Sequence, residues 1–160
     1  MVSSSLEIIP FTSSDEEYQK LFELEKSLDY HVKNWGGVEM LKYHAGRIPE
    51  KCKPETNFLS FNNKVFGYGY TGHDEWAFDP TLLDSSISFP SEEEYLPYAQ
   101  ELLNYQMSLA KKMERVKTFR AWLFNGNNFY INFYLKNGFE VSQVEFVSLI
   151  SLEEFNPKNF

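Results

Sequence analysis

Few side chains in this sequence are of the types that bind metals or act as nucleophiles. The three histidines, His31, His44 and His73, are far apart and lack the short spacings at which two imidazoles share one metal ion. The single cysteine, Cys52, lies between two lysines, which favour thiol reactivity, but spacing assigns it no histidine or asparagine partner. We therefore expect no metal site, and we expect Cys52 to be an ordinary surface or loop residue.

The acidic residues offer more chemistry. Asp84 lies on the polar face of the alternating segment 83–89, whose other face is largely apolar. A carboxylate in this position could accept a proton from a substrate amine, directly or through water. Glu75, in an acidic stretch close to a turn, is a second candidate base. Both are also explained as acids on a solvated surface.

The segments that must position these residues predict a mixed sheet with helices packed against it, in the α/β or α+β class. We expect about six to seven strands and about four helices. Capping-box serines open the first helix, two asparagines and a lysine turn a hairpin, and a glycine closes the last helix. The expected strands are 6–9, 58–61, 65–70, 83–89, 119–123, 139–141 and 145–152, and the expected helices are 13–29, 38–45, 92–114 and 129–137.

Two of these segments carry further expectations. Tyr98, Leu102, Tyr105 and Leu109 repeat at helical spacing and predict the buried face of the long helix. The glycines of 67–72 resemble a GxGxxG string, but they lie within a strand, so they indicate a bulge or a close backbone approach rather than a dinucleotide site. The aromatic residues of this region have two explanations: they line a groove, or they form part of the core and of its rim. They are Tyr68, Tyr70, Trp76 and Phe78.

Length and charge exclude several classes of protein. A chain of 160 residues fits a single domain, 1–160, and it has 23 acidic against 15 basic residues, for a net charge of −8. An acidic surface repels nucleic acid and anionic membranes, so we expect neither as a partner. One cysteine fits a reducing compartment, and no apolar run reaches the roughly 20 residues that span a bilayer. We expect a cytoplasmic protein.

The stretch 127–140 resembles the C-terminal motif of the GNAT family of N-acetyltransferases. In that family an asparagine opens a helix, a Phe/Leu-Tyr pair follows, and Gly-Phe closes it. Asn127, Phe133, Tyr134, Gly138 and Phe139 match this spacing. The order of elements upstream is also similar, so the resemblance covers nearly the whole chain. It implies a GNAT acyl-CoA N-acyltransferase-like fold with a central twisted mixed sheet.

The resemblance also implies a site. Tyr134 matches the general acid that protonates the sulfur of CoA, and Asp84 would serve as the base. Asn127, Phe89 and Ser91 lie at the positions that contact acetyl-CoA, the cofactor of an active member. The acceptor would be an amine of a small molecule or peptide. The structural alternative for Tyr134 is a residue that packs the short helix on the sheet, with its hydroxyl at the surface.

Two features depart from the family. Its pyrophosphate loop, Gln/Arg-x-x-Gly-x-Gly/Ala, falls here on 89–98, which contains Glu92, Glu93, Glu94 and Pro97 but no glycine and no basic residue. Glycines let backbone N–H groups approach a phosphate, and carboxylates repel it. Tyr130 stands where members usually have a small residue beside the cofactor, and it would crowd that channel.

These departures resemble the degenerate half of tandem GNAT proteins. The strings 51–53 and 119–122 are also similar to the N-terminal halves of that kind. We predict a GNAT-like domain that is degenerate for acyl-CoA binding and acts as a non-catalytic or acceptor-side half, needing no cofactor. The alternative is an active N-acetyltransferase that holds acetyl-CoA by atypical contacts. The last strand needs cover at its edge, so we expect a homodimer or a tandem second GNAT domain.

Overall fold

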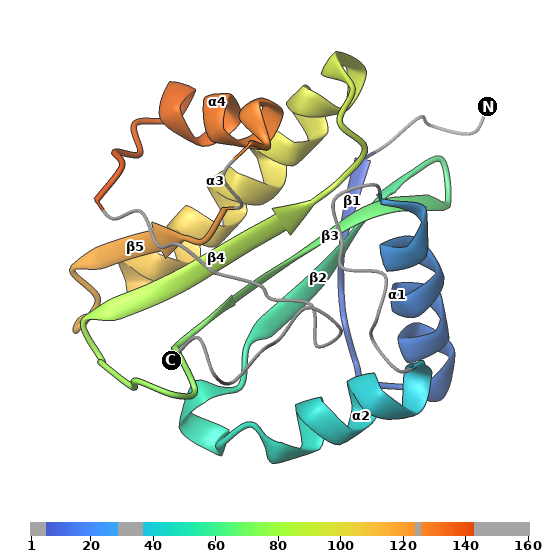
Figure 1. The fold of residues 1–160 in the computed structure, drawn as a ribbon, viewed down its shortest axis with the longest axis horizontal. Helices are drawn as coiled ribbons and strands as arrows, with labels where there is room; N and C mark the ends of the chain where they lie inside the picture. The colour runs from blue at the N-terminus through green and yellow to red at the C-terminus, as the bar shows by residue number, and fades with distance from the viewer. Residues whose placement is uncertain (1–5, 29–36, 124–125, 143–160) are drawn as a thin grey trace, which may run out of the picture.

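The computed structural model describes residues 6–28, 37–123 and 126–142. Five strands form one sheet in the order β1-β2-β3-β4-β5 (Figure 1). The first four strands pair antiparallel, and β5 pairs parallel to β4. Their bounds are β1 Leu6–Pro10, β2 Glu55–Phe61, β3 Lys64–Gly72, β4 Leu82–Ser88 and β5 Thr118–Ala121. The mixed sheet that the sequence predicts is confirmed.

Four α-helices flank this sheet. They are α1 Asp15–Ser27, α2 Val38–Arg47, α3 Leu96–Lys112 and α4 Asn128–Lys136, with short 3₁₀ turns at Glu50–Cys52 and Glu93–Tyr95. Ser14 and Glu17 form the expected capping box at the start of α1. None of the described helices combines the length and apolarity that a membrane span requires.

One expected strand is absent from the described residues. Residues 139–141 are not a strand, because the backbone of Phe139 serves the end of α4 instead. The Phe139 N–H donates to the Tyr134 carbonyl at 3.2 Å, Gly138 takes a φ of 84°, and the Phe139 ring packs on Tyr134. The other late strand, 145–152, lies outside the described residues. This accounts for five strands where six to seven were expected.

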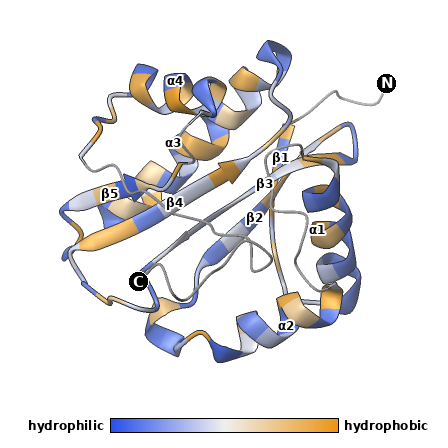
Figure 2. Cartoon of the chain, viewed as in Figure 1, coloured by the Kyte–Doolittle hydropathy of each residue, from blue (hydrophilic) through white to orange (hydrophobic). Residues whose placement is uncertain are grey.

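Helices cover both faces of the sheet. Alternate residues of β2 and β3 belong to two separate core clusters, as the pleat requires. Leu59 packs with Leu102 of α3, whereas Phe58 packs with Leu24 of α1. Figure 1 shows α3 and α4 near β4 and β5, with α1 and α2 near β1, and Figure 2 shows apolar and polar residues alternating along the helices. The α3 side holds the larger core.

The hairpin between β2 and β3 follows the sequence closely. Asn62 and Asn63 have φ values of 50° and 63°, the left-handed conformation that a tight two-residue turn needs. The glycine string of 67–72 lies in β3, so the dinucleotide interpretation is excluded and the close backbone approach is confirmed.

The buried face of α3 differs from the expectation. Ala99, Leu102, Leu103, Gln106 and Ala110 are buried, whereas the expected Tyr98, Tyr105 and Leu109 are only half-buried. Gly69 contributes to this difference, since the side chains of Leu102 and Gln106 enter the space that its missing Cβ leaves. The helix also begins at Leu96, four residues later than expected, because Pro97 is tolerated only in a first turn.

Gln106 fixes α3 to the middle of the sheet. Its side chain is completely buried and lies against β3 and β4. The Oε1 atom accepts from the Ser85 hydroxyl at 2.8 Å, and Nε2 donates to the carbonyls of Tyr70 and Ser86 at 3.1 and 3.2 Å. Both polar atoms of the Gln106 side chain are hydrogen-bonded, so burial of this amide does not oppose folding. The amide instead specifies the register of α3 on the sheet.

We predict that Gly69→Ala destabilises the fold by about 1–3 kcal/mol, the usual cost of overpacking. A Cβ there would lie 2.7 Å from the Ser86 carbonyl oxygen and 2.8 Å from Gln106 Nε2. The control is Gly46→Ala in α2, where nothing lies within 4 Å and alanine is the better helix former by about 1 kcal/mol. Chemical denaturation measures both, and equal effects would contradict the close approach.

Candidate functional site

At the end of β4, backbone N–H and C=O groups must find hydrogen-bond partners other than a neighbouring strand. The parallel pairing of β4 with β5 runs from Leu82–Thr118 to Ser85–Ala121 and stops there. Strand β4 continues to Ser88, and Phe89 follows it completely buried. Buried N–H and C=O groups require partners, so the backbone of Phe89 must find them outside the sheet.

Tyr130 of α4 supplies both partners. The Phe89 N–H donates to the Tyr130 hydroxyl oxygen at 3.0 Å, and the hydroxyl donates to the Phe89 carbonyl. In an extended chain the N–H and C=O of one residue point to the same side, so one hydroxyl can serve both. Tyr130 is 2% exposed. Its hydroxyl therefore takes the place that a neighbouring strand, or a bound ligand, would have at this position.

An aromatic cluster holds Tyr130 in place. Phe89 lies at its centre, with ring centroids 4.9 Å from Tyr130, 5.6 Å from Phe133 and 5.9 Å from Phe129. We call the cluster of Phe89, Phe129, Tyr130 and Phe133 the aromatic plug. The Asn127 side chain caps α4 by accepting from the Tyr130 N–H at 3.4 Å. The plug and the cap together fix the helix against the end of β4.

Three N–H groups of the segment that follows Phe89 bond to carbonyls within that segment. The N–H groups of Glu92, Tyr95 and Leu96 donate to the carbonyls of Pro90, Glu92 and Glu93, and Pro97 has no N–H. No residue of 89–98 has a positive φ, which an anion-binding nest of successive N–H groups requires. Burial and the neighbouring Glu94 and Glu92 raise the pKa of Tyr95. The first turn of α3 is thus poorly suited to a phosphate.

Tyr134 lies one turn after Tyr130 in the core on the α3 side. It is 2% exposed, its hydroxyl is buried, and its ring contacts Phe133 and Phe139 at 5.3 and 5.0 Å. The expectation that a structural Tyr134 would carry its hydroxyl at the surface is wrong, because α4 presses this face onto the core. Its role as a general acid stays a prediction.

Asp84 lies on the opposite face of the sheet from Ser85 and α3. The Arg120 guanidinium holds it by two hydrogen bonds, Nε to Oδ1 at 2.6 Å and Nη2 to Oδ2 at 3.0 Å. Arg120 also lies 3.5 Å from Asp74 and stacks under Trp122. Both oxygens of the Asp84 carboxylate are thus engaged by one guanidinium in a charge-assisted pair. The structure therefore does not bring Asp84 and Tyr134 together, and the basic role of Asp84 stays a prediction.

Comparison with solved structures identifies the fold. A GNAT family acetyltransferase of Staphylococcus aureus superposes with a TM-score of 0.60 at 18% sequence identity, over 91% of this chain and 99% of that chain. An aminoglycoside N-acetyltransferase in complex with CoA gives 0.65 at 14%, over 92% and 96%. The chain has the GNAT fold. A transcriptional regulator of Bacillus halodurans shares it too, with a TM-score of 0.66 at 8% identity over 90% and 100%.

These similarities establish the architecture and leave the activity open. No protein-family model and no curated protein sequence matches the chain. At such identities the fold is shared, while function depends on the particular residues of the site.

The residues of this GNAT fold do not fit acetyl-CoA at the position that the resemblance implies. Of the three expected contacts, Phe89 has both backbone groups bonded to Tyr130, and Asn127 is bonded to the Tyr130 N–H. Ser91 is exposed in the acidic segment. Tyr130 itself is buried and makes two hydrogen bonds that the sequence did not predict, and the crowding of a cofactor channel stays a prediction.

A half-buried acid on the other face was missed by the sequence analysis. Glu25 of α1 accepts from the Tyr68 hydroxyl at 2.9 Å through Oε1, while its Oε2 atom is buried and has no hydrogen-bond partner among the described residues. Burial raises the pKa of Glu25, and the Tyr68 bond partly offsets this. The two residues are 43 positions apart, so no local pattern could reveal the pair. Tyr68 is a core residue, which favours the core-and-rim interpretation of the aromatic residues.

The remaining candidates lie apart from the plug. Cys52 is 2% exposed, and its thiol contacts the Asp74 carbonyl at 3.5 Å, so its expected surface or loop position is corrected to a buried 3₁₀ turn. Glu75 is exposed, and His73 contacts the Leu82 carbonyl at 2.7 Å. Trp76 is 91% exposed.

We predict that Tyr130→Phe lowers the free energy of unfolding by about 2–4 kcal/mol. Each buried polar group that is left without a partner costs about 1–3 kcal/mol, and this change leaves two such groups on Phe89. Tyr18→Phe is the control, because its ring packs on Phe11 and no described residue hydrogen-bonds to its hydroxyl. Urea denaturation should show a change below about 0.5 kcal/mol for the control. A similarly small change for Tyr130→Phe would contradict the bonding.

We further predict that Glu25 makes stability fall as pH rises. Its folded-state pKa is raised, so its contribution is fully present below the unfolded value near 4.5 and is lost as pH rises through the folded value. Glu25→Gln never ionises, so its stability relative to the native protein should increase between about pH 5 and pH 8. The control is the exposed Glu16→Gln, whose plot of unfolding free energy against pH should run parallel to that of the native protein. A parallel plot for Glu25→Gln would refute the raised pKa of Glu25.

Proposed function

We propose that this chain is a GNAT-fold domain that does not hold acyl-CoA at the end of β4 and acts as a non-catalytic or acceptor-side half of a larger assembly. The observation that carries the proposal is the double hydrogen bond between the Tyr130 hydroxyl and the Phe89 backbone. A cofactor that used these groups would have to displace a buried tyrosine and break both bonds.

The phosphate end of the site supports the same conclusion. Three exposed glutamates precede α3, and the N–H groups of Glu92, Tyr95 and Leu96 bond within the segment. A pyrophosphate would meet carboxylates where it needs donors, and each like-charge pair at a protein surface costs on the order of 1 kcal/mol or more. The two ends of the cofactor position are therefore unfavourable for independent reasons.

The acceptor side has features that suit an amine. Tyr70 and Trp122 are 37% and 49% exposed on the face where Asp84 and Asp74 flank Arg120. Two carboxylates against one guanidinium leave this surface negative, and aromatic rings attract cations. Partial burial and the charges of Asp84 and Asp74 raise the pKa of Tyr70, so its hydroxyl stays neutral at ordinary pH. This face could receive an ammonium group in a non-catalytic half.

Calorimetric titration with acetyl-CoA tests the proposal. The native chain should show no binding at millimolar cofactor. The variant Glu92→Gly, Glu93→Arg, Glu94→Gly should also show none, because Tyr130 remains in place. Adding Tyr130→Ala to that variant should bring measurable binding. The CoA-binding aminoglycoside N-acetyltransferase is the positive control, and circular dichroism verifies folding of each variant. Micromolar affinity in the native chain or in the loop variant would contradict the proposal.

A second candidate is an active N-acetyltransferase with atypical cofactor contacts. One observation favours it: a depression of about 280 Å³ between α3 and α4 carries the polar side chains of Gln100, Asn132 and Lys136. These donors could replace the missing loop. In this case acetyl-CoA would bind the native chain, and Lys136→Ala would weaken binding while the exposed Lys64→Ala would not. Transfer to an amine acceptor would then be sought.

A further inference from the structure

The far end of α3 carries a basic surface that stands out in an acidic protein. Lys111 and Lys112 lie in its last turn, and Arg115 and Lys117 lie in the connection to β5. All four are exposed, and only Glu114 opposes them within the stretch. The helix dipole explains cations in a last turn, but its influence ends there and does not explain Arg115 and Lys117.

The described part of the chain offers these cations no partners. Among the described residues, no ion pair or hydrogen bond involves the side chains of Lys111, Lys112, Arg115 or Lys117. Most other described cations are engaged, for example Lys42 with Asp15 at 2.8 Å and Lys53 with Glu50 at 2.6 Å. Among the acidic residues that the structure describes, none forms an ion pair with these four side chains, so their positive charge is left uncompensated within the described part of the chain.

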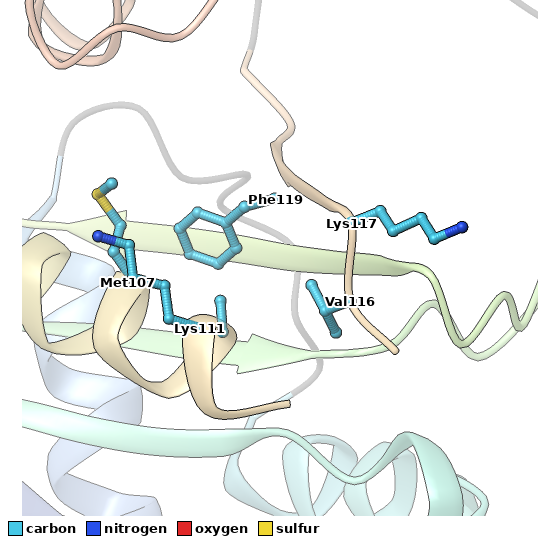
Figure 3. Close-up of a pocket in the computed structure, with 6 residues that line it drawn as sticks. Met107, Lys111, Val116, Lys117 and Phe119 are labelled. Atoms are coloured by element: carbon cyan, nitrogen blue, oxygen red, sulfur yellow. The ribbon is translucent and has the colours of Figure 1, made fainter. Parts of the chain in front are cut away.

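An apolar hollow lies within the basic surface. It has a volume of about 160 Å³ and is lined by Met107, Ala110, Val116, Phe119 and the two lysines at positions 111 and 117. In Figure 3 the Phe119 ring lies between Met107 and Val116, and the Lys117 side chain extends away from the ring. Met113, which ends α3, is 41% exposed. The hollow has room for one large apolar side chain.

We propose that this surface docks an acidic peptide segment of a partner protein, with one apolar side chain of the peptide inserted in the hollow. Charge complementarity selects the acidic partner, because Lys111 and Lys117 line the hollow and Lys112 and Arg115 lie in the same stretch of chain, none of them ion-paired within the described residues. The size of the hollow disfavours a small-molecule ligand, since sites that bury such ligands measure about 300–1,000 Å³. Several carboxylates along a peptide can reach cations that are spread over a helix end and the following connection.

The net charge of the molecule disfavours the other polyanions. A membrane or a nucleic acid presents a wide negative surface, which would also face the acidic remainder of a chain with a charge of −8. A short peptide contacts only the basic surface, and at physiological salt charges beyond about 8 Å are largely screened from it. The same patch can therefore bind a peptide while the whole molecule repels an anionic bilayer.

Fluorescence anisotropy with a labelled peptide tests this proposal on the full chain. The probe is a glutamate-rich peptide of about eight residues with a central Leu-Phe pair, titrated at low and at physiological salt. The matched probes replace the pair by Ala-Ala, or the glutamates by lysines. We expect saturable binding of the first probe, at least tenfold weaker binding of the Ala-Ala probe, and none of the lysine probe.

The double variant Lys111→Glu, Lys117→Glu should weaken binding of the first probe at least tenfold. The control Lys64→Glu reverses an exposed charge outside the surface and should change affinity less than twofold. Equal binding of the Ala-Ala probe, or equal loss in both variants, would overturn the proposal in favour of unspecific charge attraction. Vesicles of anionic lipid that bind more tightly than the peptide, or self-association detected by light scattering, would overturn it in favour of a membrane or a second copy.

Discussion

Strand β4 extends beyond the strand that pairs with it, and much of this structure follows from that mismatch. The ladder to β5 stops at Ser85, but the chain stays extended and buried as far as Phe89. A buried strand edge that lacks a neighbour has to be satisfied, because unpaired backbone groups in the core are costly. Here Tyr130 of α4 satisfies these groups.

The consequences extend along α4. Once the Tyr130 hydroxyl is bonded to Phe89, the ring must lie in the core, and Phe129 and Phe133 close around Phe89. Asn127 is then held as a helix cap, and Tyr134 is carried one turn further into the same core. Residues that the resemblance assigns to a cofactor site are thereby engaged in packing and hydrogen bonds within the core. The same atoms cannot make these contacts and contact a cofactor at once.

Local patterns in the sequence predicted much of the fold. The capping box at Ser14, the turn at Asn62 and Asn63, and the strand position of the glycine string depend on neighbours within a few residues, and these were confirmed. The buried face of α3 was predicted only in part. Leu102 is buried as expected, but the burial of Gln106 beside Gly69 was not predicted, because that space is set by the tertiary approach of helix and sheet.

The candidate site was predicted less completely, for the same reason. The resemblance to the GNAT motif indicated that Tyr130 is larger than the residue usually found at its position. It could not show which groups the hydroxyl bonds, because Phe89 lies 41 positions away. The Arg120–Asp84 pair and the Glu25–Tyr68 pair, 36 and 43 positions apart, were beyond local patterns as well.

Amide hydrogen exchange at Phe89, followed by NMR with and without acetyl-CoA, tests the central claim most directly. If the Tyr130 hydroxyl occupies the end of β4, the Phe89 amide exchanges slowly in the free protein, and millimolar acetyl-CoA changes neither its exchange rate nor its chemical shift. Exchange should become at least tenfold faster in Tyr130→Phe, while amides in the ladder between β3 and β4 stay protected. Fast exchange in the free protein that acetyl-CoA slows would contradict the account, because the cofactor would then be the partner of Phe89.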